Sequence, residues 1–429
     1  MKTNTETKFK QTEMKTVDLN NEILFEFKNG LWESKNDRDS VNAIVIRGTN
    51  FSEMGDIKGQ LLNIKVENKE LENKRLTFGD ILIERSGGGP KQPVGRVLFF
   101  DINDDKNIYS FSNFVTRLRI LQKDILMPRY VFYNLLHFYK FSIGSNFQHG
   151  STGIRNLDFK KYKSDVRIKI IDISEQKKIA GVLSKIQEAI ENQRKIIEKL
   201  EELKKSTMNK LFTNGLYGKE TKQTEIGEIP ENWEVVRLGD FFEIKQGKQL
   251  SSKENITGKI SKPFLRTSNI YWNKIDTTNI SYMYFANEEI VKLKLIKGDI
   301  LICEGGDVGR TAIWNDEIND CLYQNHIHRL RPKNENIFNY YISYFMEFAI
   351  TQKGLYVSSA NRTTIPNLSS SRLSDFNIPL PPLEEQKRIA EILSRIDNMK
   401  EEAEKKLNYL NEFFYSALDL LITGKVRLN

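Results

Sequence analysis

Pairs of arginines two positions apart are the side chains whose spacing points most directly to chemistry. Arg117 and Arg119 close the run Asn-Phe-Val-Thr-Arg-Leu-Arg, and Arg329 and Arg331 close the run Asn-His-Ile-His-Arg-Leu-Arg. Alternate residues of a strand lie on one side of it, and a guanidinium group suits both a phosphate and the edge of a guanine. The pattern is therefore typical of nucleic-acid contacts, although a solvated strand edge would give the same spacing.

Turns and glycine-rich loops extend this candidate set. Arg47 with Asn50, and Arg266 with Asn269, either contact bases or shape a turn. The glycine-rich loops either are plain tight turns or let the backbone and a basic side chain approach a phosphate. The predicted DNA-binding residues are Arg47, Asn50, Lys91, Arg96, Arg117, Arg119, Arg155, Arg266, Asn269, Arg310, Arg329, Arg331 and Arg362.

Motifs for catalysis are incomplete. The run Gly305–Thr311 resembles a phosphate-binding loop, but its glycine spacing is one residue short and Arg310 stands where that loop has lysine. A nuclease would need a carboxylate cluster, for which Asp80 with Glu84 and Asp299 with Glu304 are candidates, but no matching lysine follows. We therefore predict no catalytic residue, and metal-dependent cleavage by the purified chain would contradict this.

Histidine and cysteine spacing gives weak support for a metal site. His326 and His328 share one face of a predicted strand, and Cys321 lies nearby. The corresponding positions in the first half of the chain hold Phe114 and Thr116, so the scaffold does not require a metal. Paired cysteines are missing, and we predict no metal site.

The candidate runs belong to a sequence that occurs twice. The run Gly-Asp-Ile-Leu-Ile appears at 79–83 and at 298–302, and the strongest repeat places Ser-Glu-Gln-Lys-Lys-Ile-Ala at 174–180 and Glu-Glu-Gln-Lys-Arg-Ile-Ala at 384–390. A repeat of this length indicates a duplicated domain rather than a solenoid. Short β-type runs and the helical stretches 130–139 and 339–348 predict an α+β fold for each copy.

Each strong repeat opens a long amphipathic helix. Apolar residues keep a 4-3 spacing from Ile179 to Leu211 and from Ile389 to Leu421, which puts one seam along a helix that needs a helical partner. We predict that the two helices pair as an antiparallel coiled coil, with a pseudo-twofold axis relating the two copies. The helices also carry apolar residues beside the seam, which leave surface for further subunits: Ile196, Leu203, Ile392 and Phe413.

Composition sets the broad class of the protein. The 429 residues carry a net charge of +8, which permits nucleic-acid binding. The polar N-terminus does not resemble a signal peptide, no apolar run approaches membrane-spanning length, and two cysteines imply no disulfide framework. We therefore expect a cytoplasmic protein without membrane contact.

Three features of the sequence stand out in combination: the paired Glu-Gln-Lys-(Lys/Arg)-Ile-Ala helices, the run Ile-Pro-Leu-Pro-Pro-Leu at 378–383 before the second of them, and the run Trp-Glu-Val-Val-Arg-Leu-Gly-Asp at 233–240. Together they resemble the specificity subunit of type I restriction–modification systems. The resemblance covers nearly the whole chain. It implies target-recognition domains at 1–173 and 219–382, and conserved helical regions at 174–218 and 383–429. The first copy lacks the Ile-Pro-x-Asn-Trp run that begins the second.

That resemblance implies a non-catalytic subunit that reads an asymmetric bipartite site in double-stranded DNA, one half per domain. It also implies helices that act as a spacer and dock two methyltransferase subunits, through which restriction subunits join. S-adenosylmethionine, ATP and Mg²⁺ would bind those partners, with no cofactor in this chain. The alternative is a free-standing DNA-binding regulator with an internal pseudo-dimer, which would be stable alone and capture no methyltransferase.

Overall fold

The computed structural model describes residues 15–31, 40–88, 92–150, 155–218, 220–249, 256–355 and 368–428. The chain divides into two compact units, here called the first unit (residues 1–193 and 406–429) and the second unit (194–405). Two long helices, α4 (Ile173–Asn214) and α9 (Leu383–Thr423), each contribute one half to each unit. The division of the chain into four consecutive segments stays a prediction.

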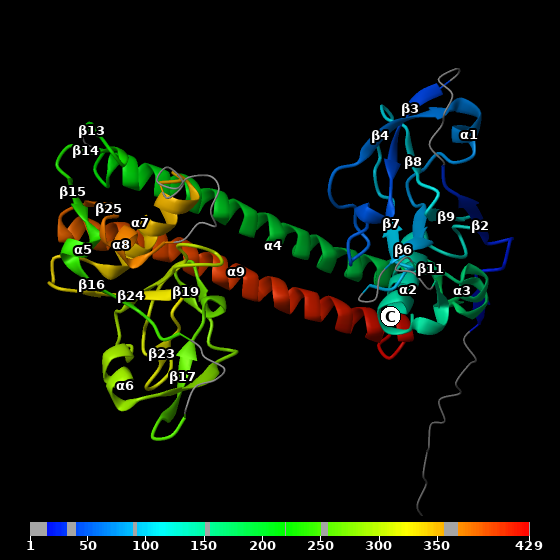
Figure 1. Cartoon of the computed structure of the whole chain (residues 1–429). Coiled ribbons are helices and arrows are strands. Elements are labelled where there is room, and N and C mark those ends of the chain that lie inside the picture. The colour runs from blue at the N-terminus through cyan, green and yellow to red at the C-terminus, as the bar shows by residue number, and fades with distance from the viewer. Residues whose placement is uncertain are drawn as a thin grey trace, which may run out of the picture. The chain divides into compact units, whose positions relative to one another are not determined.

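Two sheets form the centre of the first unit (Figure 1). One is antiparallel, in the order β2 (Phe25–Asn29), β9 (Val115–Ile120), β5 (Ile81–Glu84) and β7 (Val97–Phe99). The other has the order β4 (Leu62–Glu67), β3 (Ser40–Ile46) and β8 (Tyr109–Phe111), with β3 and β8 parallel. Every residue of β5 and β7 is buried, because α2 (Pro128–Phe141) packs on one face of the four-stranded sheet and residues of β3 and β8 pack on the other. The remaining elements are β1 (Thr16–Asp18), α1 (Asn68–Glu72), β6 (Ser86–Gly88), β10 (Gln148–His149), β11 (Arg155–Leu157), α3 (Phe159–Asp165), β12 (Arg167–Lys169) and the 3-10 turns Gly48–Asn50 and Ser145–Phe147.

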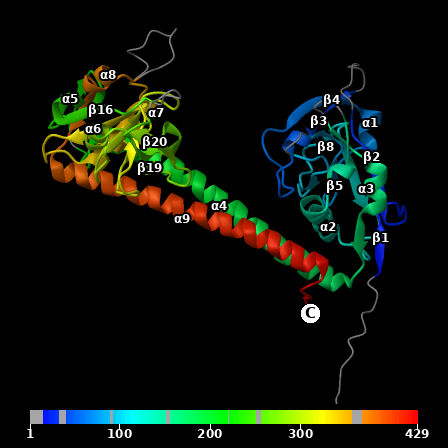
Figure 2. The same cartoon turned by 60° about the horizontal axis from the view of Figure 1, so that its bottom comes forward.

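The second unit repeats this topology (Figure 2). Its four-stranded sheet has the order β16 (Phe242–Gln246), β24 (Ile327–Pro332), β21 (Ile300–Cys303) and β22 (Thr311–Ile313), covered by α7 (Asn339–Thr351). Its three-stranded sheet has the order β20 (Ser281–Phe285), β17 (Ile260–Leu265) and β23 (Leu322–Tyr323), again with one parallel pair. The α+β fold and the internal repeat are thereby confirmed. The remaining elements are β13 (Thr221–Thr224), β14 (Gly227–Pro230), β15 (Glu234–Arg237), α5 (Leu238–Phe241), β18 (Ile270–Tyr271), β19 (Lys274–Ile275), α6 (Asn287–Leu293), α8 (Ser370–Ser374), β25 (Asn377–Leu380) and the 3-10 turn Thr267–Asn269.

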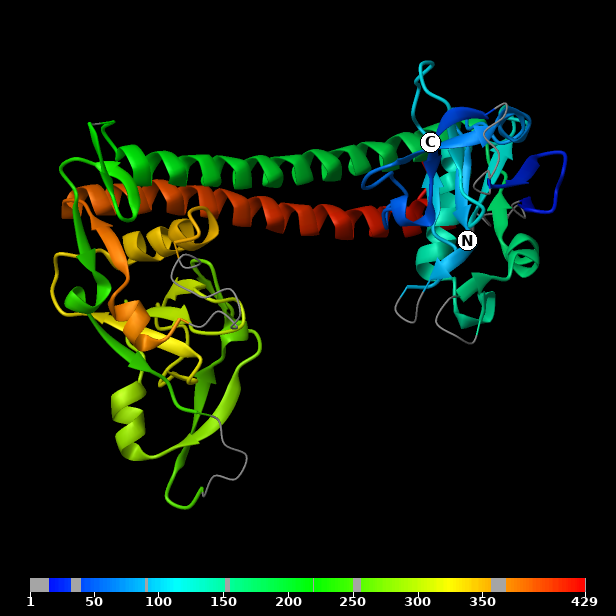
Figure 3. The same cartoon turned by 45° about the horizontal axis from the view of Figure 1, so that its top comes forward.

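The long helices pair in opposite directions within each unit (Figure 3). In the first unit, Ile179 and Leu183 near the start of α4 share a core with Phe414 and Leu418 near the end of α9. In the second unit, residues near the end of α4, among them Leu211, share a core with the first turns of α9. The predicted antiparallel pairing is confirmed, and the apolar spacing explains it, because each seam is buried by the other.

A buried glutamine in the first turns of each long helix ties that helix to its α+β domain. The Gln176 side-chain amide accepts a hydrogen bond from the Met127 N–H (2.9 Å) and donates to the carbonyls of Ile125 (2.8 Å) and Ile171 (2.9 Å). Gln386 does the same with the Phe338 N–H (2.8 Å) and two backbone carbonyls. Met127 and Phe338 immediately precede α2 and α7. The repeated glutamine therefore has a structural explanation.

The apolar shoulders of the helices are exposed at three of the four predicted positions. Ile196, Leu203 and Phe413 are 46%, 47% and 58% exposed. Ile392 contributes less apolar surface than the other three, because this side chain is partly buried against the core of the second unit. Within the described residues, no helix has the length and hydrophobicity needed to cross a bilayer.

Candidate nucleic-acid interface

The second arginine of each pair is held by an aspartate that immediately precedes the neighbouring strand. Arg119 donates from Nε and Nη2 to the two carboxylate oxygens of Asp80, both at 2.7 Å. Arg331 makes the same two bonds to Asp299, again at 2.7 Å. These hydrogen bonds raise the pKa of both arginines. Bidentate geometry of this kind fixes a guanidinium plane, and both side chains stay about one third exposed, at 30% and 31%.

The first arginine of each pair is buried inside its unit. Arg117 is 2% exposed and pairs with Glu26, while Arg329 is 1% exposed and pairs with Glu243 at 2.9 Å. Burial lowers the pKa of the Arg117 guanidinium. These two side chains therefore hold neighbouring strands together, and DNA contact by any of the four arginines stays a prediction.

The two predicted asparagines shape turns. Asn50 accepts a hydrogen bond from the Arg47 N–H at 3.0 Å and donates to two carbonyls of the following loop. Asn269 accepts from the Arg266 N–H at 2.9 Å and likewise donates to two carbonyls. Both asparagines are buried. Of the two sequence interpretations, turn formation accounts for their side chains, and it leaves Arg47 and Arg266 exposed at the start of each turn.

A surface hollow of about 460 Å³ in the first unit brings Arg47 and Arg96 together. Arg96 forms its floor, because it is 8% exposed, pairs with Glu84 (Nε to Oε2, 2.9 Å) and donates to the carbonyls of Gly48 and Phe51. Its pKa is raised by the hydrogen bond to Glu84. Arg47 lies on the rim and is the exposed cation of the two, so it is the better placed to contact a phosphate or a base.

The second unit has a different arrangement at the matching loop. Arg310 pairs with Asp307 at 2.7 Å and lies over the Tyr271 ring, 5.1 Å from its centroid. Cys303 lies between this loop and the Arg266 turn, since its N–H donates to the Arg310 carbonyl and its thiol faces the Thr267 carbonyl. The two units thus share their internal ion pairs and differ on their surfaces.

The remaining predicted residues are less informative. Arg155 is half-buried in β11, where it pairs with Gly88 of β6. Lys91 and Arg362 lie outside the described residues.

Exposed aromatic side chains are candidates that the sequence reasoning did not include. Phe114 lines the hollow of the first unit and is 53% exposed, and Tyr271, under Arg310, is 43% exposed. Aromatic rings beside cations are a common platform for unpaired or distorted bases. A usable sequence signal exists for Tyr271, which lies two residues after Asn269 at the end of the Arg266–Asn269 turn.

His328 and the candidate nuclease acids are engaged by protein partners. The buried His328 ring lies 3.0 Å from the Leu368 carbonyl and 3.2 Å from the Ser370 hydroxyl, and burial lowers its pKa. Asp80, Asp299 and Glu84 hold the arginines described above. Over the part of the chain that the structure describes, no group of three or more His, Cys, Asp or Glu side chains could hold a metal ion.

Sequence comparison identifies the two units. The family described as type I restriction modification DNA specificity domain matches residues 13–202 and again residues 230–412. A Methanocaldococcus jannaschii protein, the type I restriction enzyme MjaVIII specificity subunit, is 32% identical over 324 residues, covering 73% of this chain and 74% of that one. The chain therefore belongs to the family of type I restriction–modification DNA specificity subunits and carries two of its DNA-binding domains.

Further relatives agree. The putative type I restriction enzyme MjaX specificity subunit of the same organism is 37% identical over 210 residues, covering 48% of this chain and 49% of that one. The crystal structure of a type I restriction–modification S subunit from M. genitalium superimposes with a TM-score of 0.55 at 20% identity, covering 96% of both chains. That likeness supports the fold.

Proposed function

We propose that this chain is the non-catalytic subunit that reads an asymmetric bipartite DNA target, one half-site per domain. In this proposal it directs adenine methylation and cleavage by partner subunits. The observation that carries the proposal is the contrast between a repeated interior and divergent surfaces. Arg119–Asp80 and Arg331–Asp299 make the same hydrogen bond at 2.7 Å, whereas Arg96 is buried and Arg310 is more open. Two copies of one scaffold with unlike surfaces suit two unlike half-sites.

Partner subunits supply the chemistry in this proposal. Two methyltransferase subunits dock on the long helices, and restriction subunits join through them. S-adenosylmethionine, ATP and Mg²⁺ bind to these partners. Exposed Ile196, Leu203 and Phe413 support docking, because such side chains on a helix surface are typical of an interface.

The paired helices act as the spacer between half-sites in this proposal. Deleting one heptad from each helix removes about 10 Å of helix at ~1.5 Å per residue. This length corresponds to about three base pairs at 3.4 Å each. The deletion should therefore change the gap of the target and leave both half-sites unaltered, and a change in the half-sites with a constant gap would contradict the spacer role.

Mapping N6-methyladenine in the host genome, with and without this chain, tests the central proposal. We expect a two-part methylated motif that disappears when the chain is deleted and returns when it is supplied again. An unchanged methylation map would refute the proposal. Affinity purification distinguishes the regulator alternative, because a regulator is stable alone whereas a specificity subunit brings down a methyltransferase.

A further inference from the structure

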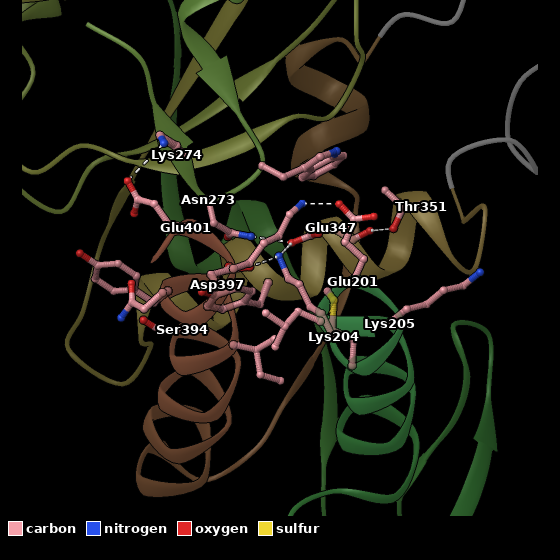
Figure 4. A pocket seen from close by; sticks show the side chains of 18 of the residues that line it. Glu201, Lys204, Lys205, Asn273, Lys274, Glu347, Thr351, Ser394, Asp397 and Glu401 are labelled. Atoms are coloured by element: carbon pink, nitrogen blue, oxygen red, sulfur yellow. Dashed lines mark hydrogen bonds and ion pairs between the residues drawn. The ribbon is translucent and has the colours of Figure 1, made fainter. Parts of the chain in front are cut away.

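The second unit contains a buried ionic cluster where α7 meets both long helices (Figure 4). The Lys204 amine of α4 lies 2.8 Å from Glu347 Oε2 of α7 and 2.8 Å from Asp397 Oδ1 of α9. The side chains of Lys204 and Glu347 are each 14% exposed, and that of Asp397 is 29% exposed. One cation thus joins the recognition domain to both helices.

The cluster reaches into the sheet region through Asn273. Its side-chain amide donates to Glu347 Oε2 at 2.5 Å and accepts from the Ser343 hydroxyl at 2.6 Å. Its backbone has φ of 55°, a left-handed conformation that is uncommon outside glycine, although asparagine tolerates it better than most residues. Tyr344 of α7 adds a hydrogen bond to Asp397 at 2.9 Å. The cluster borders a hollow of about 710 Å³ lined by α4, α7, α9 and the β18–β19 turn.

The matching place in the first unit is built from neutral groups. Tyr133 of α2 corresponds to Tyr344 and donates to Gln187, which takes the place of Asp397 and donates to the Met54 carbonyl at 2.8 Å. By the helix repeat, Phe414 stands where Lys204 does, and its ring lies 6.3 Å from that of Tyr133. Leu136, three residues after Tyr133, replaces Glu347. The three matching positions are therefore charged in the second unit and neutral in the first.

Stability alone does not account for the ionic version. Replacing a buried ion pair by well-packed apolar residues is often neutral or stabilising, whereas removing one partner leaves an uncompensated charge. In the first unit, the three matching positions hold apolar and amide side chains, and α2 contacts α9 elsewhere through His137 and Asp419 (3.0 Å). Three charged groups on three elements, however, satisfy each other in only one arrangement, so they select an orientation.

We propose that Lys204 is a positioning residue that fixes the orientation of the second recognition domain on the helix pair. This inference rests on the proposed function, because orientation matters through the half-site that the domain reads. Without the amine, Glu347 and Asp397 repel one another, and α7 is left with its apolar packing and the Tyr344–Asp397 hydrogen bond, which fix its orientation on the helices less tightly. The second half-site is then accepted at more than one spacing.

The test is methylome mapping in a host that lacks the chromosomal copy and carries the full-length chain or a variant. The readout is a ratio of two methylation levels. The first is measured at sites whose gap differs from the native gap by one base pair, and it is divided by the level at native sites. For Lys204→Met we expect this ratio to rise by about tenfold. The matched substitution in the first unit, Phe414→Met, should leave it unchanged, because no charge is lost there.

Two further variants separate positioning from folding. Asp397→Asn keeps the side-chain volume and a Tyr344 acceptor while removing one charge, and should raise the ratio by about threefold. The triple variant Lys204→Phe, Glu347→Leu and Asp397→Gln transplants the neutral set of the first unit and should restore the original ratio.

The outcomes are distinct. An unchanged ratio in soluble Lys204→Met would overturn the inference. If Lys204→Met does not accumulate, an unchanged ratio in Asp397→Asn would do the same. Equal loss of methylation at both kinds of site would also overturn it. If the unmodified chain itself yields no two-part motif, the proposed function fails instead.

Discussion

The buried glutamine in the first turns of each long helix allows a quantitative prediction. Replacing Gln386 by leucine keeps the size of the side chain but removes three hydrogen bonds to backbone groups. The Gln386 side chain is fully buried, so water can reach its backbone partners mainly at Asn336, which is an exposed residue. A buried polar group without its partner costs about 1–3 kcal/mol. Allowing for partial relaxation, Gln386→Leu should lower the free energy of unfolding of the second unit by about 3–6 kcal/mol.

Urea denaturation followed by tryptophan fluorescence measures this loss. Trp233 and Trp314 are both buried in the second unit and report on it. With a urea dependence of about 2 kcal/mol/M, the midpoint should fall by about 1.5–3 M. The exposed neighbour Lys387→Ala is the control and should shift stability by no more than ~0.5 kcal/mol. A midpoint for Gln386→Leu that matches this control would refute the reasoning.

The equivalent glutamine of the first unit, Gln176, allows the same stability prediction to be tested there. Gln176→Leu removes the equivalent three bonds, so circular dichroism should show a loss of similar size. Buried tryptophans of the second unit should report little of it.

Three further predictions concern acidity, DNA and the helices. Burial lowers the pKa of His328, so the unfolded chain binds the proton more tightly than the folded one. The second unit should therefore lose stability as the pH falls below about 6.5, and His328→Thr should make its melting temperature less dependent on pH. Arg47→Ala should weaken discrimination at the first half-site only, and Arg266→Ala at the second only, each lowering methylation by about tenfold or more. If both substitutions changed the preference at both half-sites equally, the two arginines would not be separate readers. Deleting residues 193–199 and 401–407 together should shorten the target gap by about three base pairs in the methylome.

Periodicity predicted the elements that depend on local pattern. The helical stretches 130–139 and 339–348 lie inside α2 and α7, and the 4-3 seam is buried along α4 and α9. Trp233, at the start of the second repeat, is fully buried. Such features follow from the spacing of apolar residues, which one sequence displays completely.

Pairing across strands was harder to predict. The spacing of Arg117 and Arg119 places both on one side of β9, but spacing does not show what faces that side. The structure places acids of β2 and the β5 region there, on strands far away in sequence. A signal was available, because Glu26 and Asp80 recur as Glu243 and Asp299 together with the arginines. Acids and bases that recur together indicate internal pairing.

The division of each long helix between two units has a consequence for synthesis. The second unit is one continuous segment, whereas the core of the first unit includes Phe414, Leu418 and Ile422, close to the end of the chain. Translation proceeds from the N-terminus, so the domain made first is completed last. A nascent chain halted before residue 406 lacks the α9 side chains that complete the cover of Ile179 and Leu183. Such an unfinished product exposes apolar surface that chaperones and proteases can recognise.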